Sequence, residues 1–491
     1  MKLRPIMFVG TGSDVGKSLI NAGFCRIFKQ DGYKPAPFKA QNMSLNSYAT
    51  SDELEIGRAQ AVQAEACGIP CMVEMNPILL KPSSDNRAQI VLNGKPYANK
   101  DAIDYFHNDD RAELINAAHS GFDKLSENFS PVVMEGAGSI SEMNLWDKDL
   151  VNMPMAEYAN AATYLIADID KGGVFASIYG SIVLLPEKHR KLIKGVIINK
   201  FRGDERLFDK GKIMLEELTG VPVIGVLPYM RDVFIEQEDA VILDNQNKES
   251  AKDAKVKIGV ILLKSMSNFT DFNTLERTPG VHLQYLSSPE MIKNVDIIIL
   301  PGSKNTISDM QYLRNNGFVS AIWEHYKNDK PIYGICGGFQ MMGQMIFDPL
   351  HIEGEIDAIS GLGIFPTHST IEEGKTTRQC TFTMNANTNS GSGYEIHSGT
   401  TTINSENMEN FLCTLDNGAK DGYFINNKCW GTYIHGIFDN KCVIDSILHE
   451  INTEINALDD YQAEKEKNYD RLADYIRKHI DIRRVYQDLK I

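Results

Sequence analysis

Short apolar segments rich in β-branched residues recur along the first half of the chain, and each ends in loop residues. They are Ile6–Val9, Val132–Met134, Tyr164–Ala167, Val196–Ile198 and Val223–Leu227. Segments of helical length, such as Leu19–Phe28 and Glu55–Cys67, lie between them. Continuously apolar strands that alternate with helices are typical of a parallel sheet covered by helices. Residues 1–235 are therefore predicted to form an α/β domain.

A second domain follows a polar stretch that begins after Pro228, and residues 236–255 have the composition of an exposed linker. A new series of apolar segments comprises Val256–Leu263, Ile297–Leu300, Ile332–Ile335 and Gly431–Ile434. Residues 256–445 are predicted to form a second α/β domain. Residues 446–491 are charged, with apolar positions at helical spacing, and are predicted to form a helical extension.

Composition narrows the classes of protein that fit. A chain of 491 residues with 43% hydrophobic and 23% charged residues is typical of a globular protein of two or more domains. No apolar run approaches the ~20 residues of a membrane span, and the basic start leads into a glycine loop rather than a secretory signal, so we expect a cytoplasmic protein. A net charge of −15 argues against nucleic-acid binding, and eight scattered cysteines argue against a disulfide scaffold. A homo-oligomer remains open.

A glycine-rich loop directly follows the first apolar segment and precedes a helical one. It reads Gly10-Thr11-Gly12-Ser13-Asp14-Val15-Gly16-Lys17-Ser18. In this context backbone N–H groups bind phosphates, the lysine neutralises them and the hydroxyl holds Mg²⁺. Five residues separate the outer glycines where the strict pattern has four, and this variant resembles the loop of dethiobiotin synthetases, which phosphorylate carboxylates. The loop is predicted to bind ATP through Gly12, Ser13, Val15, Gly16, Lys17 and Ser18; the alternative is a glycine turn that binds nothing.

A magnesium site needs oxygen ligands from other strand ends. Glu135 directly follows a buried strand, and the resemblance to dethiobiotin synthetases implies that it binds the metal together with Ser18. The same resemblance implies Glu55 as the other acidic ligand, although a solvated helix carboxylate explains Glu55 equally well. It also implies that Asn199 reads adenine, while a loop asparagine that caps a turn is the alternative.

Cys336 differs from the other cysteines because small residues flank it between an apolar strand and a helical segment, in Gly334-Ile335-Cys336-Gly337-Gly338. Such a turn exposes a nucleophile beside backbone N–H groups. His435 ends another apolar strand, and a parallel neighbour would bring it to Cys336 as the base. Gly302, Ser303 and Gly337 are predicted to line the oxyanion site, and Gln340 to help hold glutamine.

This arrangement resembles the class I glutamine amidotransferases, whose turn reads Gly-x-Cys-x-Gly-x-Gln. That family carries a glutamate two residues after the catalytic histidine, where this chain has Ile437. The third member of the triad is therefore missing or supplied elsewhere. Glu395 or His397 would be in place to orient His435, but a structural role for either is as plausible.

Four further motifs resemble those of the cobyric acid synthases. They are the segments 39–47, 168–176, 199–204 and 267–272. The resemblance implies that ATP and glutamine are used to amidate the b, d, e and g carboxylates of adenosylcobyrinic acid a,c-diamide. It also implies that the corrinoid and acyl phosphate are bound on the side of the chain that carries Gln41, Asn42, Asp168, Asp170 and Lys171.

Three alternatives remain open from the sequence. The cobyrinic acid a,c-diamide synthases share both halves, and the Lys39–Met43 run favours the enzyme that makes four amides. A partition-type ATPase would leave Cys336 and His435 unexplained. A stand-alone cysteine hydrolase would leave Lys17 without a role.

Overall fold

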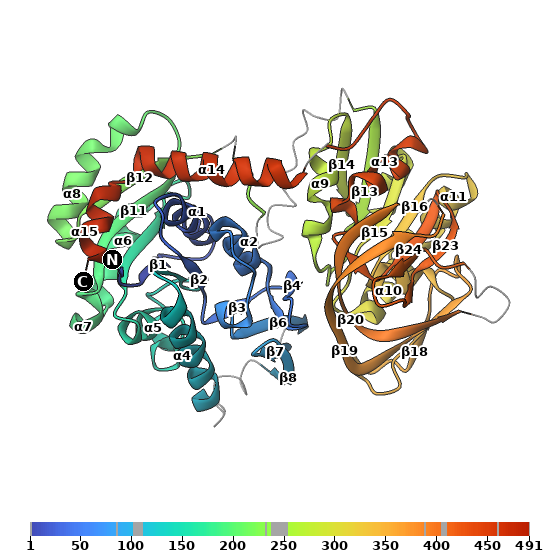
Figure 1. Cartoon of the computed structure of the whole chain (residues 1–491), viewed down its shortest axis with the longest axis horizontal. Coiled ribbons are helices and arrows are strands. Elements are labelled where there is room, and N and C mark those ends of the chain that lie inside the picture. The colour runs from blue at the N-terminus through green and yellow to red at the C-terminus, as the bar shows by residue number, and fades with distance from the viewer. Residues whose placement is uncertain are drawn as a thin grey trace.

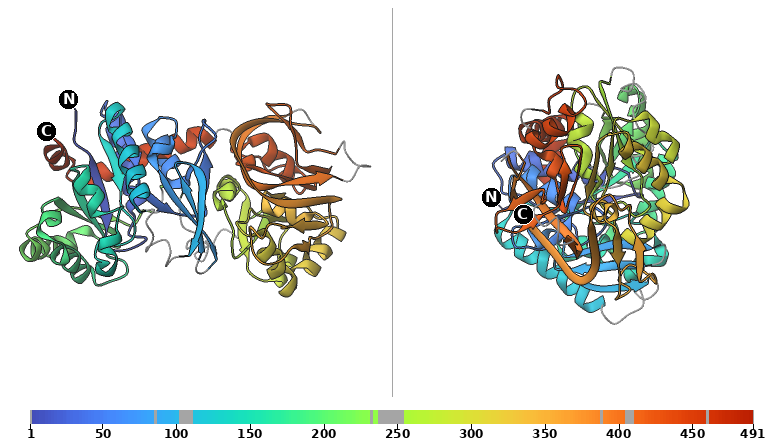
Figure 2. Two further views of the ribbon diagram at one scale, coloured as in Figure 1. Left: turned by 90° about the horizontal axis from the view of Figure 1, so that it is seen from below. Right: turned by 90° about the vertical axis from the view of Figure 1, so that its right-hand side faces the viewer.

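The structure is a computed structural model that describes residues 2–84, 87–101, 111–230, 233–236, 254–386, 389–403, 410–458 and 461–490. Two α/β lobes lie side by side, and both ends of the chain lie on the N-terminal lobe (Figure 1). Both lobes are also separate in the view from below (Figure 2). The predicted pair of α/β units is confirmed.

The N-terminal lobe is built on a parallel sheet in the order β12-β11-β10-β1-β9-β2. Its strands are β1 (Ile6–Gly10), β2 (Ala36–Phe38), β9 (Val132–Glu135), β10 (Ala162–Asp168), β11 (Ile193–Phe201) and β12 (Val223–Pro228). β1, β9 and β10 are buried along their whole length, which explains their continuously apolar sequence. Because parallel strands share one carboxyl edge, the residues that follow β1, β9, β10 and β11 meet there.

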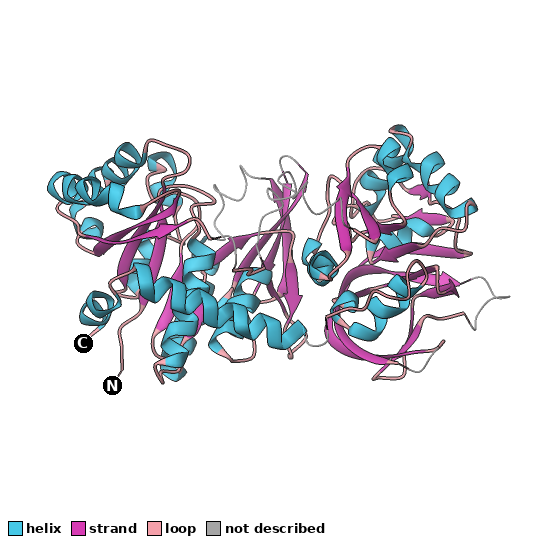
Figure 3. Cartoon of the chain, turned by 90° about the horizontal axis from the view of Figure 1, so that it is seen from above, coloured by secondary structure: helices cyan, strands magenta, loops and turns pink. Residues whose placement is uncertain are grey.

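Helices cover both faces of this sheet (Figure 3). They are α1 (Lys17–Gln30), α2 (Arg58–Cys67), α4 (Arg111–Asn128), α5 (Met153–Tyr158), α6 (Val174–Leu184), α7 (Glu187–Arg190) and α8 (Asp209–Thr219), with 3₁₀ turns η1 (Val73–Met75), η2 (Met143–Lys148) and η3 (Glu205–Phe208). The expected helix Glu55–Cys67 is shorter than predicted. Its first three residues, Glu55–Gly57, form a strand instead, because they pair with Ser47–Ala49.

Two small sheets lie on the side of this lobe that faces the C-terminal lobe (Figure 1). One has the order β3-β6-β7-β8, with β3 (Gln41–Met43), β6 (Ile78–Ser84), β7 (Arg87–Leu92) and β8 (Lys95–Asp101). The other is the hairpin of β4 (Ser47–Ala49) and β5 (Glu55–Gly57). The hairpin leads directly into α2, so it connects the lobe interface to the main sheet.

The C-terminal lobe contains a second sheet in the order β14-β13-β15-β16-β24-β23, parallel except for β23. Its strands are β13 (Val256–Ile261), β14 (Val281–Leu286), β15 (Ile297–Leu300), β16 (Ile332–Ile335), β23 (Tyr423–Asn426) and β24 (Cys429–Thr432). Its helices are α9 (Asn273–Arg277), α10 (Thr306–Asn315), α11 (Phe318–Lys327), α12 (Gly337–Met342) and α13 (Lys441–His449), with 3₁₀ turns η5 (Phe269–Phe272), η6 (Pro289–Asn294) and η8 (Ile437–Asp439).

A mixed sheet completes this lobe, with the main order β18-β17-β19-β20-β25. Its strands are β17 (Met345–Phe347), β18 (Ala358–Ser360), β19 (Thr367–Met384), β20 (Ser390–Ile403), β21 (Cys413–Leu415), β22 (Lys420–Asp421) and β25 (Ile434–His435). The strand predicted up to His435 is thus divided between two sheets, since β24 pairs with β16 and β25 pairs with β20. The helical segment predicted after Cys336 is short, because α12 ends at Met342 and β17 begins at Met345.

The last helices, α14 (Tyr461–His479) and α15 (Ile482–Leu489), return to the N-terminal lobe (Figure 1). Leu472 and Ile476 join the same buried core as Phe8 and Phe24. Each such buried side chain contributes about 1.5–3 kcal/mol to stability. Most of the described residues 461–490 are helical, whereas α13 crosses the expected boundary at 446 and packs in the C-terminal core. Among the described residues, no helix combines the length and apolarity of a membrane span.

Candidate active sites in the two lobes

The phosphate loop lies where the sequence predicts it, between β1 and α1. Gly16 is the residue before α1 and has a φ of 97°, a left-handed conformation that favours glycine. A Cβ at this position would lie 2.2 Å from Nδ2 of Asn199. Lys17 Nζ donates to the carbonyls of Gly12 at 2.8 Å and Gly138 at 3.1 Å. The first turn of α1 thus presents its backbone N–H groups and an ammonium at one place, the chemistry of a phosphate site.

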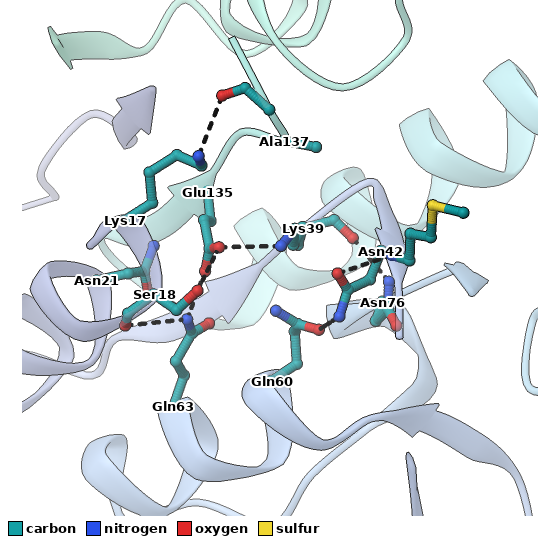
Figure 4. A network of polar contacts seen from close by, with 12 residues as sticks. Lys17, Ser18, Asn21, Lys39, Asn42, Gln60, Gln63, Asn76, Glu135 and Ala137 are labelled. Atoms are coloured by element: carbon teal, nitrogen blue, oxygen red, sulfur yellow. Dashed lines mark hydrogen bonds and ion pairs between the residues drawn. The ribbon is translucent and has the colours of Figure 1, made fainter. Parts of the chain in front are cut away.

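Glu135 is the centre of a buried polar network beside this loop (Figure 4). Its Oε1 accepts from the Ser18 hydroxyl at 2.7 Å and lies 3.0 Å from Nζ of Lys39, and its Oε2 accepts from Gln63 at 2.7 Å. Although burial alone would raise the pKa of Glu135, the Lys39 ammonium and the hydrogen bonds outweigh it and lower the pKa. Glu135 therefore remains an anion at the edge of the phosphate loop.

The donors at this place fit a magnesium ion. A carboxylate and a hydroxyl oxygen lie side by side, and Mg²⁺ prefers one or two such ligands together with phosphate oxygens and water. Among the described residues, no group of three or more His, Cys, Asp or Glu side chains forms a complete metal site. The phosphates would therefore have to supply part of the coordination. Binding of Mg²⁺ by Ser18 and Glu135 stays a prediction.

Glu55, the other predicted metal ligand, pairs with two lysines, and its binding of a metal stays a prediction. Glu55 is 1% exposed, and its two oxygens contact the ammonium groups of Lys81 at 2.7 Å and of Lys375 from the other lobe. Burial would raise the pKa of Glu55, but the two lysines outweigh it and hold the pKa well below its usual range. Both oxygens of Glu55 thus contact ammonium groups in this structure. Through Lys375, Glu55 joins the two lobes.

Of the residues predicted on the other strand ends, Asn199 contacts the phosphate loop directly, and Asp168 is connected to it through Lys200. Asn199 is 3% exposed and donates from Nδ2 to the Val15 carbonyl at 2.9 Å, so it supports the loop from behind, and its contact with adenine stays a prediction. Asp168 is buried and lies 2.9 Å from Nζ of Lys200. The exposed Asp170 pairs with Arg202, and Lys171 is exposed.

Gln41 and Asn42 lie on β3, toward the C-terminal lobe. Asn42 is 2% exposed and donates to Oε1 of Gln60 at 3.1 Å (Figure 4). Gln60 and Gln63 are three residues apart, so they share one face of α2. This face therefore connects the Asn42 side to Glu135. Contact of Gln41 or Asn42 with a substrate stays a prediction.

Cys336 occupies a strained turn between β16 and α12. Its φ of 50° and ψ of −110° are unusual for a residue with a side chain, and strain of this kind is typical of nucleophile turns. A Cβ at Gly338 would lie 2.1 Å from the Leu300 carbonyl, so the close packing of the turn requires glycine there. β16 and β24 are parallel, with Gly334 opposite Gly431. The residues that follow these two strands therefore lie at the same edge of the sheet, as predicted.

His435 contacts Cys336 and a third residue that the sequence reasoning missed. Its Nδ1 lies 2.7 Å from Oδ2 of Asp271, and the other Asp271 oxygen accepts from the Gly436 N–H at 2.9 Å. Burial alone would lower the pKa of His435, but Asp271 and the hydrogen-bonded Cys336 outweigh it and raise the pKa to about 10. An imidazolium at neutral pH stabilises a neighbouring thiolate. Cys336, His435 and Asp271 thus have the arrangement of a nucleophile, a base and an orienting acid, and their catalytic roles stay a prediction.

Neither Glu395 nor His397, the two candidates from the sequence for the third member of the triad, orients His435. Glu395 pairs with Arg378, and His397 lies against the ring of Tyr433 with its Nδ1 3.2 Å from the Gly399 carbonyl. Their strand β20 does pair with β25, which carries His435. The signal for Asp271 in the sequence is the motif 267–272, which contains it.

The predicted oxyanion residues lie beside Cys336. A Cβ at Gly337 would lie 2.8 Å from the backbone nitrogen of Ser303, and one at Gly302 would lie 3.1 Å from Cε1 of His435. Gly337 and Ser303 thus bring two backbone segments to one side of the thiol. Gln340 is 3% exposed and bonds to Thr306 and Tyr433, so it braces α12, and its contact with glutamine stays a prediction.

Comparison with known proteins agrees with this geometry. Residues 6–241 match the CobQ/CobB/MinD/ParA nucleotide binding domain, and residues 257–443 match the CobB/CobQ-like glutamine amidotransferase domain. A cobyric acid synthase of Bacteroides fragilis is 54% identical over 99% of this chain and 98% of its own length. That of Parabacteroides distasonis is 54% identical over 99% of both chains, and that of Thermoanaerobacter sp. is 46% identical over 98% of both. The chain belongs to the cobyric acid synthase family.

Membership of the cobyric acid synthase family covers both lobes. A partition-type ATPase would need only the first lobe, and a stand-alone cysteine hydrolase would need only the second. The similarity extends over nearly the whole chain, so the predicted combination of a nucleotide-binding domain and a glutamine amidotransferase domain is confirmed.

Replacing Asp271 by asparagine should slow glutamine hydrolysis by about 10²–10⁴-fold, by analogy with the orienting acid of serine proteases. The amide removes the carboxylate that raises the pKa of His435, so the imidazolium loses its proton at lower pH than in the parent protein. Glutamate release measured across pH checks this, and the loss should be larger at neutral pH than in acid. An unchanged rate would show that Asp271 does not orient His435.

Proposed function

We propose that this protein converts adenosylcobyrinic acid a,c-diamide to adenosylcobyric acid by amidating the b, d, e and g carboxylates, with ATP and glutamine as co-substrates. The observation that carries the proposal is that one chain joins a phosphate loop with Lys17 to a Cys336–His435–Asp271 triad. A carboxylate is a poor electrophile, so amide formation needs an activating nucleotide as well as a nitrogen source. Family membership supports the corrinoid as the substrate.

Ammonia is released in the C-terminal lobe. The Cys336 thiolate attacks the side-chain carbonyl carbon of glutamine, and backbone N–H groups near Ser303 and Gly337 stabilise the oxyanion. The carbon–nitrogen bond breaks as His435 gives its proton to the leaving nitrogen, so ammonia departs and a thioester remains. His435 then takes a proton from water, the hydroxide attacks the thioester, and glutamate leaves with regeneration of the thiolate.

The carboxylate is activated in the N-terminal lobe. A carboxylate oxygen of the corrinoid attacks the terminal phosphorus of ATP, ADP leaves, and ammonia displaces phosphate from the acyl phosphate. Lys17 and the backbone N–H groups of α1 neutralise the charge that develops on the phosphate oxygens. Mg²⁺ bound at Ser18 and Glu135 would supply further charge neutralisation. Gln41, Asn42, Asp168, Asp170 and Lys171 are proposed to line the corrinoid side.

Mass spectrometry of the corrinoid tests this proposal. Adenosylcobyrinic acid a,c-diamide incubated with the protein, ATP, Mg²⁺ and glutamine should show four successive acid-to-amide mass changes. Each change should depend on ATP. If the protein acted only on the fully acidic precursor, and stopped after two changes, it would be a cobyrinic acid a,c-diamide synthase instead.

A further inference from the structure

The loop Asn46–Tyr48 of the nucleotide-binding lobe contacts the turn that carries Asp271. The Asn46 carboxamide accepts from the backbone N–H of Phe269 at 3.0 Å, and the Asn268 carboxamide accepts from the backbone N–H of Ser47 at 3.0 Å. Asn46 and Asn268 are 2% and 3% exposed. Two reciprocal, buried hydrogen bonds therefore join the lobes two residues before the acid of the triad.

The same loop also reaches His435 through aromatic rings. The Tyr48 ring lies 4.8 Å from the Tyr394 ring, edge on, and the Tyr394 ring stacks on the His435 imidazole with centroids 5.5 Å apart. Arg58 lies over the other side of Tyr48, 4.7 Å from the ring centroid. Tyr48 of the nucleotide-binding lobe thus packs on the Tyr394 ring, which stacks on the His435 imidazole.

We propose that Asn46 and Tyr48 are positioning residues for the glutaminase triad, contributed by the nucleotide-binding lobe. This inference rests on the proposed glutaminase chemistry, but not on the identity of the corrinoid. Asn46 holds the turn of Asp271, and Tyr48 holds the ring that stacks on His435. Glutamine hydrolysis is therefore competent only while the lobes are docked, which prevents wasteful release of ammonia.

The turn itself explains why it needs an external support. Asn268 has a φ of 51°, a strained conformation for a residue with a side chain, and the Asp271 N–H closes the turn on the Asn268 carbonyl at 3.0 Å. Without Asn46, the buried Phe269 N–H loses its acceptor, and an unsatisfied buried donor destabilises the conformation that leaves it unpaired. The turn would relax to satisfy it and would carry Asp271 away from His435.

A continuous set of contacts connects this loop to the phosphate site. The Asn46 carbonyl accepts from the Arg58 N–H at 3.0 Å, at the first residue of α2. The same helix carries Gln63, which donates to Glu135 beside Ser18. Asn46 therefore lies between the helix that contacts the candidate metal ligand and the turn that orients the catalytic histidine.

Asn46→Ala tests the proposal through glutamate release, with ammonia-dependent amidation as the second readout. A misplacement of about 1 Å in an active site costs up to about 10²-fold, so we expect a 10- to 100-fold lower kcat for glutamine and an unchanged ammonia-dependent rate. Asn46→Asp keeps an oxygen acceptor for the Phe269 N–H and should restore most of the rate. Tyr48→Leu, which keeps an apolar contact without the ring, should also lower kcat and gives an independent test.

Gln379→Ala is the matched control, because Gln379 donates across the same interface at 3.1 Å but to the Ala49 carbonyl rather than to the Asp271 turn. It should leave both activities unchanged. The proposal is overturned if Asn46→Ala keeps the parent rate of glutamate release, if Gln379→Ala loses as much, or if the ammonia-dependent rate falls equally. A parent protein that releases glutamate but forms no amidated corrinoid would refute the proposed substrate alone.

Discussion

Cys336→Ser is expected to abolish glutamine-dependent amidation and to leave amidation with added ammonium intact. Serine keeps the size of the side chain, but its hydroxyl is far less acidic than a thiol and does not form the anion that the His435 imidazolium stabilises. Loss of a triad nucleophile reduces turnover by more than about 10³-fold. Glutamate release and corrinoid mass, measured on the same samples with each nitrogen source, check both halves of this result.

The matched control is Cys442→Ser, which changes a half-buried thiol outside the triad. It should behave as the parent protein with both nitrogen sources. If Cys336→Ser still released glutamate at the parent rate, the nucleophile would have to be another group. If it lost the ammonia-dependent reaction as well, Cys336 would be needed for the fold rather than for the chemistry.

Lys17→Ala is expected to abolish amidation from both nitrogen sources. The change removes the ammonium that lies at the first turn of α1, and loss of one preorganised charge in such a site costs about 10²–10³-fold in rate. ATP consumption and corrinoid amidation should fall together. Basal glutamine hydrolysis by the other lobe should persist, since Lys17 contacts the loop and the Gly138 carbonyl rather than the glutaminase triad.

Lys194→Ala provides the comparison, because Lys194 is a lysine of the same lobe that bonds only to a backbone carbonyl on the surface. Its amidation rate should equal that of the parent. Retention of ATP-dependent amidation in Lys17→Ala would mean that the loop serves a structural purpose, and the second lobe would then act alone as a hydrolase.

The sequence predicted the strand ends well because the relevant signals are local. Phosphate loops and nucleophile turns need glycine where the backbone closely approaches another segment of the same chain. Gly16 therefore marks the phosphate loop, and Gly338 marks the nucleophile turn. Apolar strands of a parallel sheet carry their following residues to one edge. Glu135 therefore lies at the phosphate loop and His435 lies at Cys336, although about a hundred residues separate each pair.

The site contacts that the sequence does not predict join distant parts of the chain. Asp271 reaches His435 across 164 positions, and no spacing rule predicts which acidic residue arrives there. Glu55 is paired rather than solvated, because its partner Lys375 lies in the other lobe, 320 positions away. Residues at a lobe interface carry the periodicity of their own strand or helix, and that periodicity contains no information on the opposing surface.

The sequence does not predict that α14 packs on the N-terminal lobe, for a related reason. An apolar stripe predicts that a helix is buried on one side, but it does not say against which core. In the structure, Ile476 packs so closely on α1 that a Cβ at Gly23 would lie 2.1 Å from its side chain. Arg26 of α1 adds ion pairs to Glu466 and Asp470.

This return makes the amidotransferase lobe an insertion rather than an appendage. The polypeptide leaves the nucleotide-binding lobe once, comes back once, and closes its first lobe only with its final helices. A fragment truncated before residue 254 would expose the apolar side of α1 that Leu472 and Ile476 cover. A variant of the first lobe that uses free ammonia would therefore need residue 236 joined directly to residue 461, so that α14 and α15 are kept.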